Sequence, residues 1–457
     1  MILERFGPVM GKEKYAMPLE RDLAGLMLSH YKRVQELLPD KEKGISEIRW
    51  VLDHVEVESG GEKCLVVAGL FPAIDEEGKE IPGVRATPSV ICIPKNLMKD
   101  EDWDLFKRKD ENGEDRAQKE ELVSGIVKNK ETLKLYNAHG WGGNPYVMTL
   151  PMIDMAIEYD GVSVLMGVMG SMKTTRVDMS PRELRDSNMY GWTEIKKQIM
   201  GLMYLVEGKE QFEKNEKCRE IRRVLIGHSM QGRTTLRLLV EELNKLPNTY
   251  FVPITPVMRG AHKEGAQHVI LGHDMPGKLM KTEMGVTSLL MATETREKVL
   301  CWVLPVIKGV IKHYLHEGSP YGENLLLLSH LLEYLNNPWA VMNSTKLLDN
   351  ADVAIGKNTR HLLANNVDKF MLVRAAKDKV LSPEQLQDLI LDLATPMKIV
   401  DDELVIDVGG EPIRVRACYF TANHYLALRH WNALIQEELV YDLKKNGVKL
   451  PNKKTGE

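Results

Sequence analysis

The sequence has few cysteines, and their arrangement excludes two kinds of site. Its 457 residues include five cysteines, an odd number, scattered along the chain without a CxxC pair. This argues against a disulfide framework and against a cysteine-based zinc site. The pattern is typical of a protein in a reducing compartment, so we expect a cytoplasmic location.

Long apolar runs and a strong charge of one sign are also missing. No uninterrupted apolar run reaches the roughly 20 residues that a spanning helix needs, and residues 1–17 lack the apolar core of a secretory signal. We therefore expect no stable membrane insertion. The formal net charge is −4, so no overall basic field draws the chain to nucleic acid. Homo-oligomer formation is left open.

The composition that is present suits a globular protein, with 43% hydrophobic and 28% charged residues. From residue 131 onward, strand-like and helix-like segments alternate, which predicts an α/β fold with a mostly parallel sheet and helices on both faces. We expect strands at 132–138, 162–167, 223–227, 250–256 and 369–374, a hairpin-like pair at 404–408 and 413–418, and helices at 146–159, 192–205, 232–246, 383–393 and 426–444.

Two other segments flank or interrupt this alternation. Residues 1–130 form an N-terminal extension, with a helix at 19–38, strands at 48–57, 64–70 and 89–93 that start the sheet, and a charged excursion at 95–130. Residues 258–366 are mostly helical and apolar, most clearly at 299–316 and 325–335. They interrupt a core made of 131–257 and 367–457, and a lid or cap in this place would lie over the carboxyl edge of the strands, where ligands bind.

Ser229 lies between a predicted strand and a predicted helix, in the run 227–232 (Gly-His-Ser-Met-Gln-Gly). A serine on such a sharp turn exposes its hydroxyl above the sheet and points the next backbone N–H at a reacting carbonyl. The run resembles the Gly-x-Ser-x-Gly motif of the α/β-hydrolase superfamily. It departs from that motif at Gln231, which stands where the second glycine would be.

Two later segments resemble the rest of the superfamily's triad, in the chain order serine, acid, histidine. Asp378 follows the strand expected at 369–374, and His424 lies between the last strand and the last helix. The resemblance implies that Asp378 orients His424 and that His424 deprotonates Ser229. The residues alone also allow Asp378 to be a turn or cap residue and His424 to be a structural histidine.

Residues 137–145 (Asn-Ala-His-Gly-Trp-Gly-Gly-Asn-Pro) follow an apolar strand and resemble the superfamily's oxyanion loop. Two backbone N–H groups would then stabilise the oxyanion, those of Trp141 and Met230. The same mapping makes four further residues candidate substrate contacts: His139, Gly140, His228 and Gln231.

The resemblance implies a serine hydrolase of the esterase or lipase type. It would cleave a carboxylic ester, or a related acyl bond, of a hydrophobic small molecule through an acyl-enzyme on Ser229, with no metal and no cofactor. Two alternatives stay open. One is an acyltransferase with the same triad, and the other is a non-catalytic ligand-binding relative of the fold, for which Gln231 is the best support.

Two other patterns point elsewhere. Residues 163–174 resemble a phosphate loop, but Met172 replaces the glycine before Lys173, which weakens a nucleotide-binding hypothesis. His262, His268 and His273 do not share one helix face, which disfavours a metal site.

Overall fold

The structure is a computed structural model that describes the chain in segments. These are 18–39, 43–108, 113–140, 143–168, 170–174, 191–208, 220–258, 321–336, 354–355, 359–378, 389–390, 392–395, 397–400 and 403–451. Several predictions lie outside the described residues, namely Trp141, the three histidines at 262, 268 and 273, the helix at 299–316 and most of the helix at 383–393.

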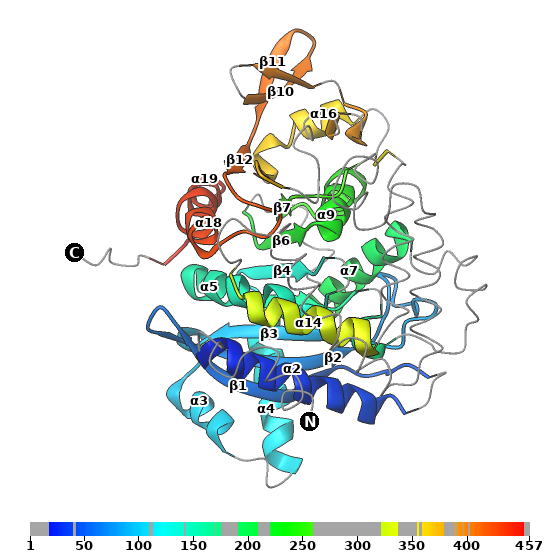
Figure 1. Ribbon diagram of the computed structural model, residues 1–457, viewed down its shortest axis with the longest axis vertical. Coiled ribbons are helices and arrows are strands. Elements are labelled where there is room, and N and C mark those ends of the chain that lie inside the picture. The colour runs from blue at the N-terminus through cyan, green and yellow to red at the C-terminus, as the bar shows by residue number, and fades with distance from the viewer. Residues whose placement is uncertain are drawn as a thin grey trace, which may run out of the picture.

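A nine-stranded sheet in the order β1-β2-β3-β5-β4-β6-β7-β8-β12 runs through the centre of the molecule (Figure 1). The strands from β5 to β12 in this order are parallel, and β1, β2 and β3 join them through antiparallel pairs. The predicted mostly parallel sheet is therefore confirmed. The strands are Arg49–Ser59 (β1), Glu62–Phe71 (β2), Thr87–Pro94 (β3), Lys134–Ala138 (β4), Val162–Met166 (β5), Arg223–His228 (β6), Thr249–Ile254 (β7), Leu372–Ala375 (β8) and Ala417–Phe420 (β12).

Helices cover both faces of this sheet, as the alternating pattern predicts. One hydrophobic cluster contains residues of α3 (Asp100–Lys107), α4 (Gly113–Lys128), α7 (Trp192–Glu207) and α9 (Met230–Glu241). The other contains residues of α2 (Pro18–Leu37), α5 (Thr149–Tyr159), α14 (Glu323–Asn336), α18 (Leu428–Ala433) and α19 (Val440–Lys445). Short helical turns accompany them at Lys95–Leu97 (η1), Pro145–Met148 (η2), Ser171–Lys173 (η3), Leu243–Lys245 (η5) and Val367–Lys369 (η7), with a helix at Arg360–Ala364 (α16) and a π-helix at Leu434–Leu439 (η8).

The central strand β6 shows why the sequence forms this sheet. Val224 and Ile226 pack in one hydrophobic cluster, and Leu225 between them packs in the other. Successive side chains of a strand point to opposite faces, and both faces of β6 are covered. A strand of this kind is apolar throughout rather than alternating, and every residue from Arg223 to His228 is buried.

A smaller three-stranded sheet is inserted between β8 and β12. It has the order β11-β10-β9 and consists of Met397–Val400 (β9), Glu403–Val408 (β10) and Glu411–Val415 (β11). The predicted hairpin is present, but its second strand does not continue to residue 418. The chain leaves the small sheet after Val415, and Ala417–Phe420 pairs with β8 in the large sheet. The apolar pattern of residues 413–418 is that of a single strand, because the two strands differ only in the sheet that supplies their hydrogen-bond partners.

Helix α14 matches the helix expected at 325–335, and polar contacts fix it to the N-terminal part of the chain. The buried carboxylate of Glu333 accepts hydrogen bonds from the hydroxyl of Tyr31 and from the backbone N–H of Met172, the latter at 3.0 Å. The side-chain amide of Asn324 donates to Glu20 at 3.0 Å. Part of segment 258–366 is thus held against α2. None of the helices in the described ranges is long and apolar enough to cross a membrane.

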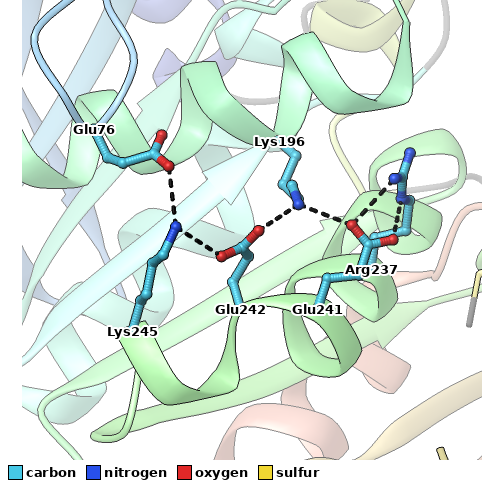
Figure 2. Close-up of polar contacts among 6 residues, drawn as sticks. All are labelled: Glu76, Lys196, Arg237, Glu241, Glu242 and Lys245. Carbon is cyan, nitrogen blue, oxygen red and sulfur yellow. Dashed lines mark hydrogen bonds and ion pairs between the residues drawn. The ribbon is translucent and has the colours of Figure 1, made fainter.

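A chain of ion pairs links α7 to the C-terminal end of α9 (Figure 2). At its centre, the ammonium group of Lys196 lies 2.8 Å from the carboxylate of Glu241 and also contacts Glu242. The side chain of Lys196 is only 10% exposed, so these pairs are less screened than ordinary surface pairs. The network helps to fix α9, the helix that follows Ser229, and its members are Glu76, Lys196, Arg237, Glu241, Glu242 and Lys245.

Candidate active site

Ser229 sits on a strained turn between β6 and α9. Its backbone has φ 57° and ψ −116°, a conformation that non-glycine residues rarely adopt and that costs on the order of 1–3 kcal/mol. Neighbouring backbone holds it there. The N–H of Ser229 donates to the carbonyl of Ile254 at 2.9 Å, and its carbonyl accepts from the N–H of Val257 at 3.0 Å. The loop after β7 therefore fixes the turn, which presents the serine at the carboxyl edge of the sheet.

Two glycines let β6 and α9 approach closely around this turn. A Cβ atom on Gly227 would lie 2.1 Å from the carbonyl oxygen of Gln231 and 2.2 Å from the hydroxyl of Thr235. A Cβ atom on Gly232 would lie 2.8 Å from the Cα of Pro256. Gly232, one position later than the second glycine of the superfamily motif, thus allows a close approach of α9 to the chain at the end of β7.

We expect Gly227→Ala to destabilise the fold by ~3 kcal/mol, because the added methyl group collides with helix backbone that cannot rotate away. Urea-induced unfolding monitored by circular dichroism measures the change. Gly25→Ala is a matched control, because Gly25 is an exposed position of α2 with nothing within 4 Å of the added Cβ. That variant should gain about 0.5–1 kcal/mol from better helix propensity. Equal effects of the two substitutions would contradict the packing argument.

Asp378 and His424 are joined by a hydrogen bond at the same edge of the sheet. The Nδ1 atom of His424 lies 2.9 Å from the Oδ2 atom of Asp378, and both side chains are almost completely buried. A carboxylate oxygen accepts, so Nδ1 carries the proton. The Nε2 atom of His424 is then the basic nitrogen of the neutral ring. This is the tautomer that a general base for a serine needs.

The backbone explains why residues 46 positions apart meet here. β8 and β12 are parallel neighbours, so their carboxyl ends lie side by side. The loops that follow them are also bonded to each other. The N–H of Ala376 donates to the carbonyl of Phe420 at 2.8 Å, and the N–H of Lys377 donates to the carbonyl of Ala422 at 3.0 Å. The acid and the histidine are thus carried by one hydrogen-bonded pair of loops.

The predicted oxyanion loop lies against the Ser229 turn. A Cβ atom on Gly140 would lie 3.4 Å from the Cβ of Ser229. Met230 is the first residue of α9, so its N–H is one of the four helix-start amides without a partner inside the helix. The second predicted donor, Trp141, lies outside the described residues.

Both ring nitrogens of His139 form hydrogen bonds with backbone groups near the predicted oxyanion loop. Its Nδ1–H donates to the carbonyl of Gly140 at 2.8 Å, and its Nε2 accepts from the N–H of Val168 at 3.0 Å. Burial lowers the pKa of His139 to about 4, so the ring is neutral at pH 7. The ring thus links the loop after β4 to the loop after β5, and a substrate contact by His139 stays a prediction.

His228 and Gln231, the other two polar side chains of the serine motif, have different surroundings. The Nε2 atom of His228 lies 2.9 Å from the carbonyl oxygen of His424. Gln231 is fully buried, and within the described part of the chain neither polar atom of its side-chain amide has a hydrogen-bond partner. Such a group costs about 1–3 kcal/mol when it stays unpaired. No contact in the structure explains why Gln231 occupies the position of a glycine.

Two further findings concern the segment that resembles a phosphate loop and the residues that could bind a metal. Met172 and Lys173 have φ values of 57° and 62°, so the turn at Lys173 differs from a phosphate loop that opens a regular helix. In the described ranges, no group of three or more histidine, cysteine, aspartate or glutamate residues is arranged to hold a metal ion.

Two residues beside the candidate triad, Tyr425 and His330, were not predicted from the sequence. The ring of Tyr425 lies 4.7 Å from that of His228, and its hydroxyl is 3.3 Å from the Nε2 of His330 on α14. A Cβ atom on Gly143, in the oxyanion loop, would lie 3.6 Å from the Cε1 of His330. No sequence spacing could reveal this contact, because His330 is 95 residues from Tyr425.

The chain matches no known family model and no curated protein. Among solved structures it is similar to the enol-lactonase from Burkholderia xenovorans LB400, at 12% identity and a TM-score of 0.41, over 68% of this chain and 92% of that one. It is also similar to an esterase from Exiguobacterium antarcticum, at 14% identity and a TM-score of 0.40, over 68% and 91%. A third similar structure is the Cif epoxide hydrolase from Acinetobacter nosocomialis, at 11% identity and a TM-score of 0.41, over 93% and 96%.

The fold assignment comes from the chain's own topology. A mostly parallel sheet carries a serine on a strained strand-to-helix turn at the end of β6. A bonded acid–histidine pair follows β8 and β12, in the order serine, acid, histidine. This combination defines one fold class, and the chain has the α/β-hydrolase fold.

Proposed function

We propose that this chain is a hydrolase that cleaves a carboxylic ester of a hydrophobic small molecule through an acyl-enzyme on Ser229. The observation that carries the proposal is the 2.9 Å hydrogen bond from His424 to Asp378, which leaves the other ring nitrogen of His424 basic. The strained turn at Ser229 and the buried state of all three side chains support it.

In the first half of the reaction, Oγ of Ser229 attacks the carbonyl carbon of the ester while Nε2 of His424 takes the hydroxyl proton. Asp378 stabilises the imidazolium that forms. The negative charge on the carbonyl oxygen is bound by the backbone N–H of Met230 and, by the resemblance, that of Trp141. Each such donor contributes about 3 kcal/mol in the transition state. The bond to the alcohol then breaks, and the alcohol takes its proton from His424.

In the second half, water attacks the acyl group on Ser229. His424 takes a proton from this water, and the resulting tetrahedral intermediate collapses. The carboxylic acid leaves, and Oγ of Ser229 recovers its proton from His424. In this scheme His424 makes every proton transfer, and Asp378 keeps its charge throughout.

Stopped-flow mixing of the protein with p-nitrophenyl butyrate tests the proposal. We expect a burst of p-nitrophenol close to one equivalent per active site when deacylation is the slower step. After an acid quench, mass spectrometry should find one butyryl group on the peptide that contains Ser229. A series of p-nitrophenyl esters of increasing chain length then tests the hydrophobic substrate.

Two outcomes would count against the proposal. A butyryl group on another residue would remove Ser229 as the nucleophile. Failure of both p-nitrophenyl esters and a fluorophosphonate probe to react with Ser229 would favour the non-catalytic alternative. An acyl-enzyme that is stable in water, but is discharged by an added alcohol, would instead indicate acyl transfer.

A further inference from the structure

His228 links the nucleophile and the base directly. It precedes Ser229 in the chain, and its Nε2 atom lies 2.9 Å from the backbone carbonyl oxygen of His424. A carbonyl oxygen can only accept, so Nε2 of His228 carries a proton and donates it. The residue bonded covalently to the serine is therefore also hydrogen-bonded to the backbone of the histidine.

The burial of His228 fixes this donor. The residue is 1% exposed, and burial lowers its pKa to about 3, with the nearby His424 acting in the same direction. The ring is neutral at pH 7 and carries one proton. That proton is held on Nε2 by the hydrogen bond, and Nδ1 has no hydrogen-bond partner in the ranges that the structure describes. A neutral ring of one tautomer does not change its bonding across the physiological pH range.

The loop that carries His424 has no regular secondary structure, so contacts with other parts of the chain fix its position. Residues 421–427 connect β12 to α18 without forming a strand or a helix. The start of the loop is held by the bond from Lys377 to the carbonyl of Ala422, and its end by the bond from Tyr321 to the carbonyl of Leu426. His228 bonds the middle of the loop, at the base itself.

We infer that His228 is a positioning residue, whose hydrogen bond to the carbonyl of His424 sets the base against Ser229. The inference rests on the proposed function and differs from the sequence-based expectation that His228 contacts the substrate. Asp378 fixes the ring of His424, and His228 fixes its backbone. A shift of about 1 Å in a catalytic group can cost roughly 100-fold in rate, so loss of this bond should lower the rate of acylation.

Two substitutions of similar length separate the hydrogen bond from the packing of the ring. In His228→Gln, the side-chain amide nitrogen can donate from about the position of Nε2. In His228→Met, the side chain fills similar space without a donor. We expect His228→Met to lower kcat for p-nitrophenyl butyrate by roughly 10- to 100-fold with KM within about twofold. His228→Gln should recover kcat to within about fivefold of the natural protein.

A fluorophosphonate probe gives a second readout, because its reaction with Ser229 depends on the base and not on recognition of the ester. We expect His228→Met to slow this labelling in proportion to kcat and His228→Gln to restore it. His361→Met, at an exposed position of α16, controls for a methionine placed elsewhere. If the methionine variant does not fold, His228→Asn replaces it, since an amide at the position of Nδ1 fits the space but cannot reach His424.

The outcomes are distinct. Slow acylation in the methionine or asparagine variant, with recovery in the glutamine variant, supports the positioning role. A natural kcat in the methionine or asparagine variant, or an equal loss of kcat in all variants, overturns it. A raised KM with unchanged kcat also overturns it and would make His228 a substrate contact. Failure of the proposed function appears differently, because the natural protein would then not acylate Ser229 at all.

Discussion

Replacement of Ser229 by alanine is expected to lower kcat for p-nitrophenyl butyrate by roughly 10⁶-fold. The variant keeps the bonded Asp378–His424 pair but has no hydroxyl for the base to activate. Alanine keeps the Cβ atom of serine and removes only the hydroxyl, so the fold should be retained. Steady-state hydrolysis at 25 °C, together with the burst amplitude, measures the loss.

Ser171→Ala is the matched control for this substitution. Ser171 is 1% exposed and lies in η3, after strand β5, and its hydroxyl has no hydrogen-bond partner among the described residues. We expect its kcat to stay within about twofold of the natural value, as for a buried group without a role in the reaction. Equal rates for the Ser229→Ala variant and the natural protein would show that any hydrolysis arises elsewhere on the molecule.

Replacement of Asp378 by asparagine should lower kcat by about 10⁴-fold. An asparagine amide would donate a hydrogen bond to Nδ1 of His424, where the carboxylate now accepts one. The ring would then carry its proton on Nε2, and it could not take the proton of Ser229. The side chains are nearly the same size, so the buried site should be retained and the loss should arise from the wrong tautomer.

Asp104→Asn controls for the chemical change, because Asp104 is an exposed residue of α3 paired with Lys107. Its replacement should leave kcat unchanged. The Asp378→Asn variant should also lose the fast burst, because acylation is the step that needs the base. Retention of the burst and of kcat would identify Asp378 as a turn residue, which is the other interpretation that the sequence allows.

Most of the secondary structure followed from local sequence. The expected strands and helices of the core agree with β4 to β8 and with α5, α7 and α9 to within a few residues. Apolar periodicity encodes burial directly, and burial on both faces of a central sheet leaves little ambiguity. The segment 413–418 was predicted as one strand, because a residue's identity does not record which sheet supplies its hydrogen bonds.

The candidate triad was also visible in the sequence, because its members follow a fixed chain order at strand ends. Their roles stay predictions until acylation of Ser229 is measured. The roles of the neighbouring histidines could not be inferred in this way. Substrate contact by His139 and His228 stays a prediction, and only the structure shows that each ring also has a backbone partner, Gly140 and His424 respectively.

The sequence by itself determined the alternation of strands and helices, the place of Ser229 between a strand and a helix, and the order of the three candidate catalytic residues. Each of these depends on local periodicity, turn chemistry or chain order. The tertiary structure decided the tautomer of His424, the hydrogen bond from His228 to the backbone of His424, and the place of α14 beside Tyr425. These features are contacts between residues far apart in the chain, and only the packed sheet and its loops bring such atoms within hydrogen-bonding distance.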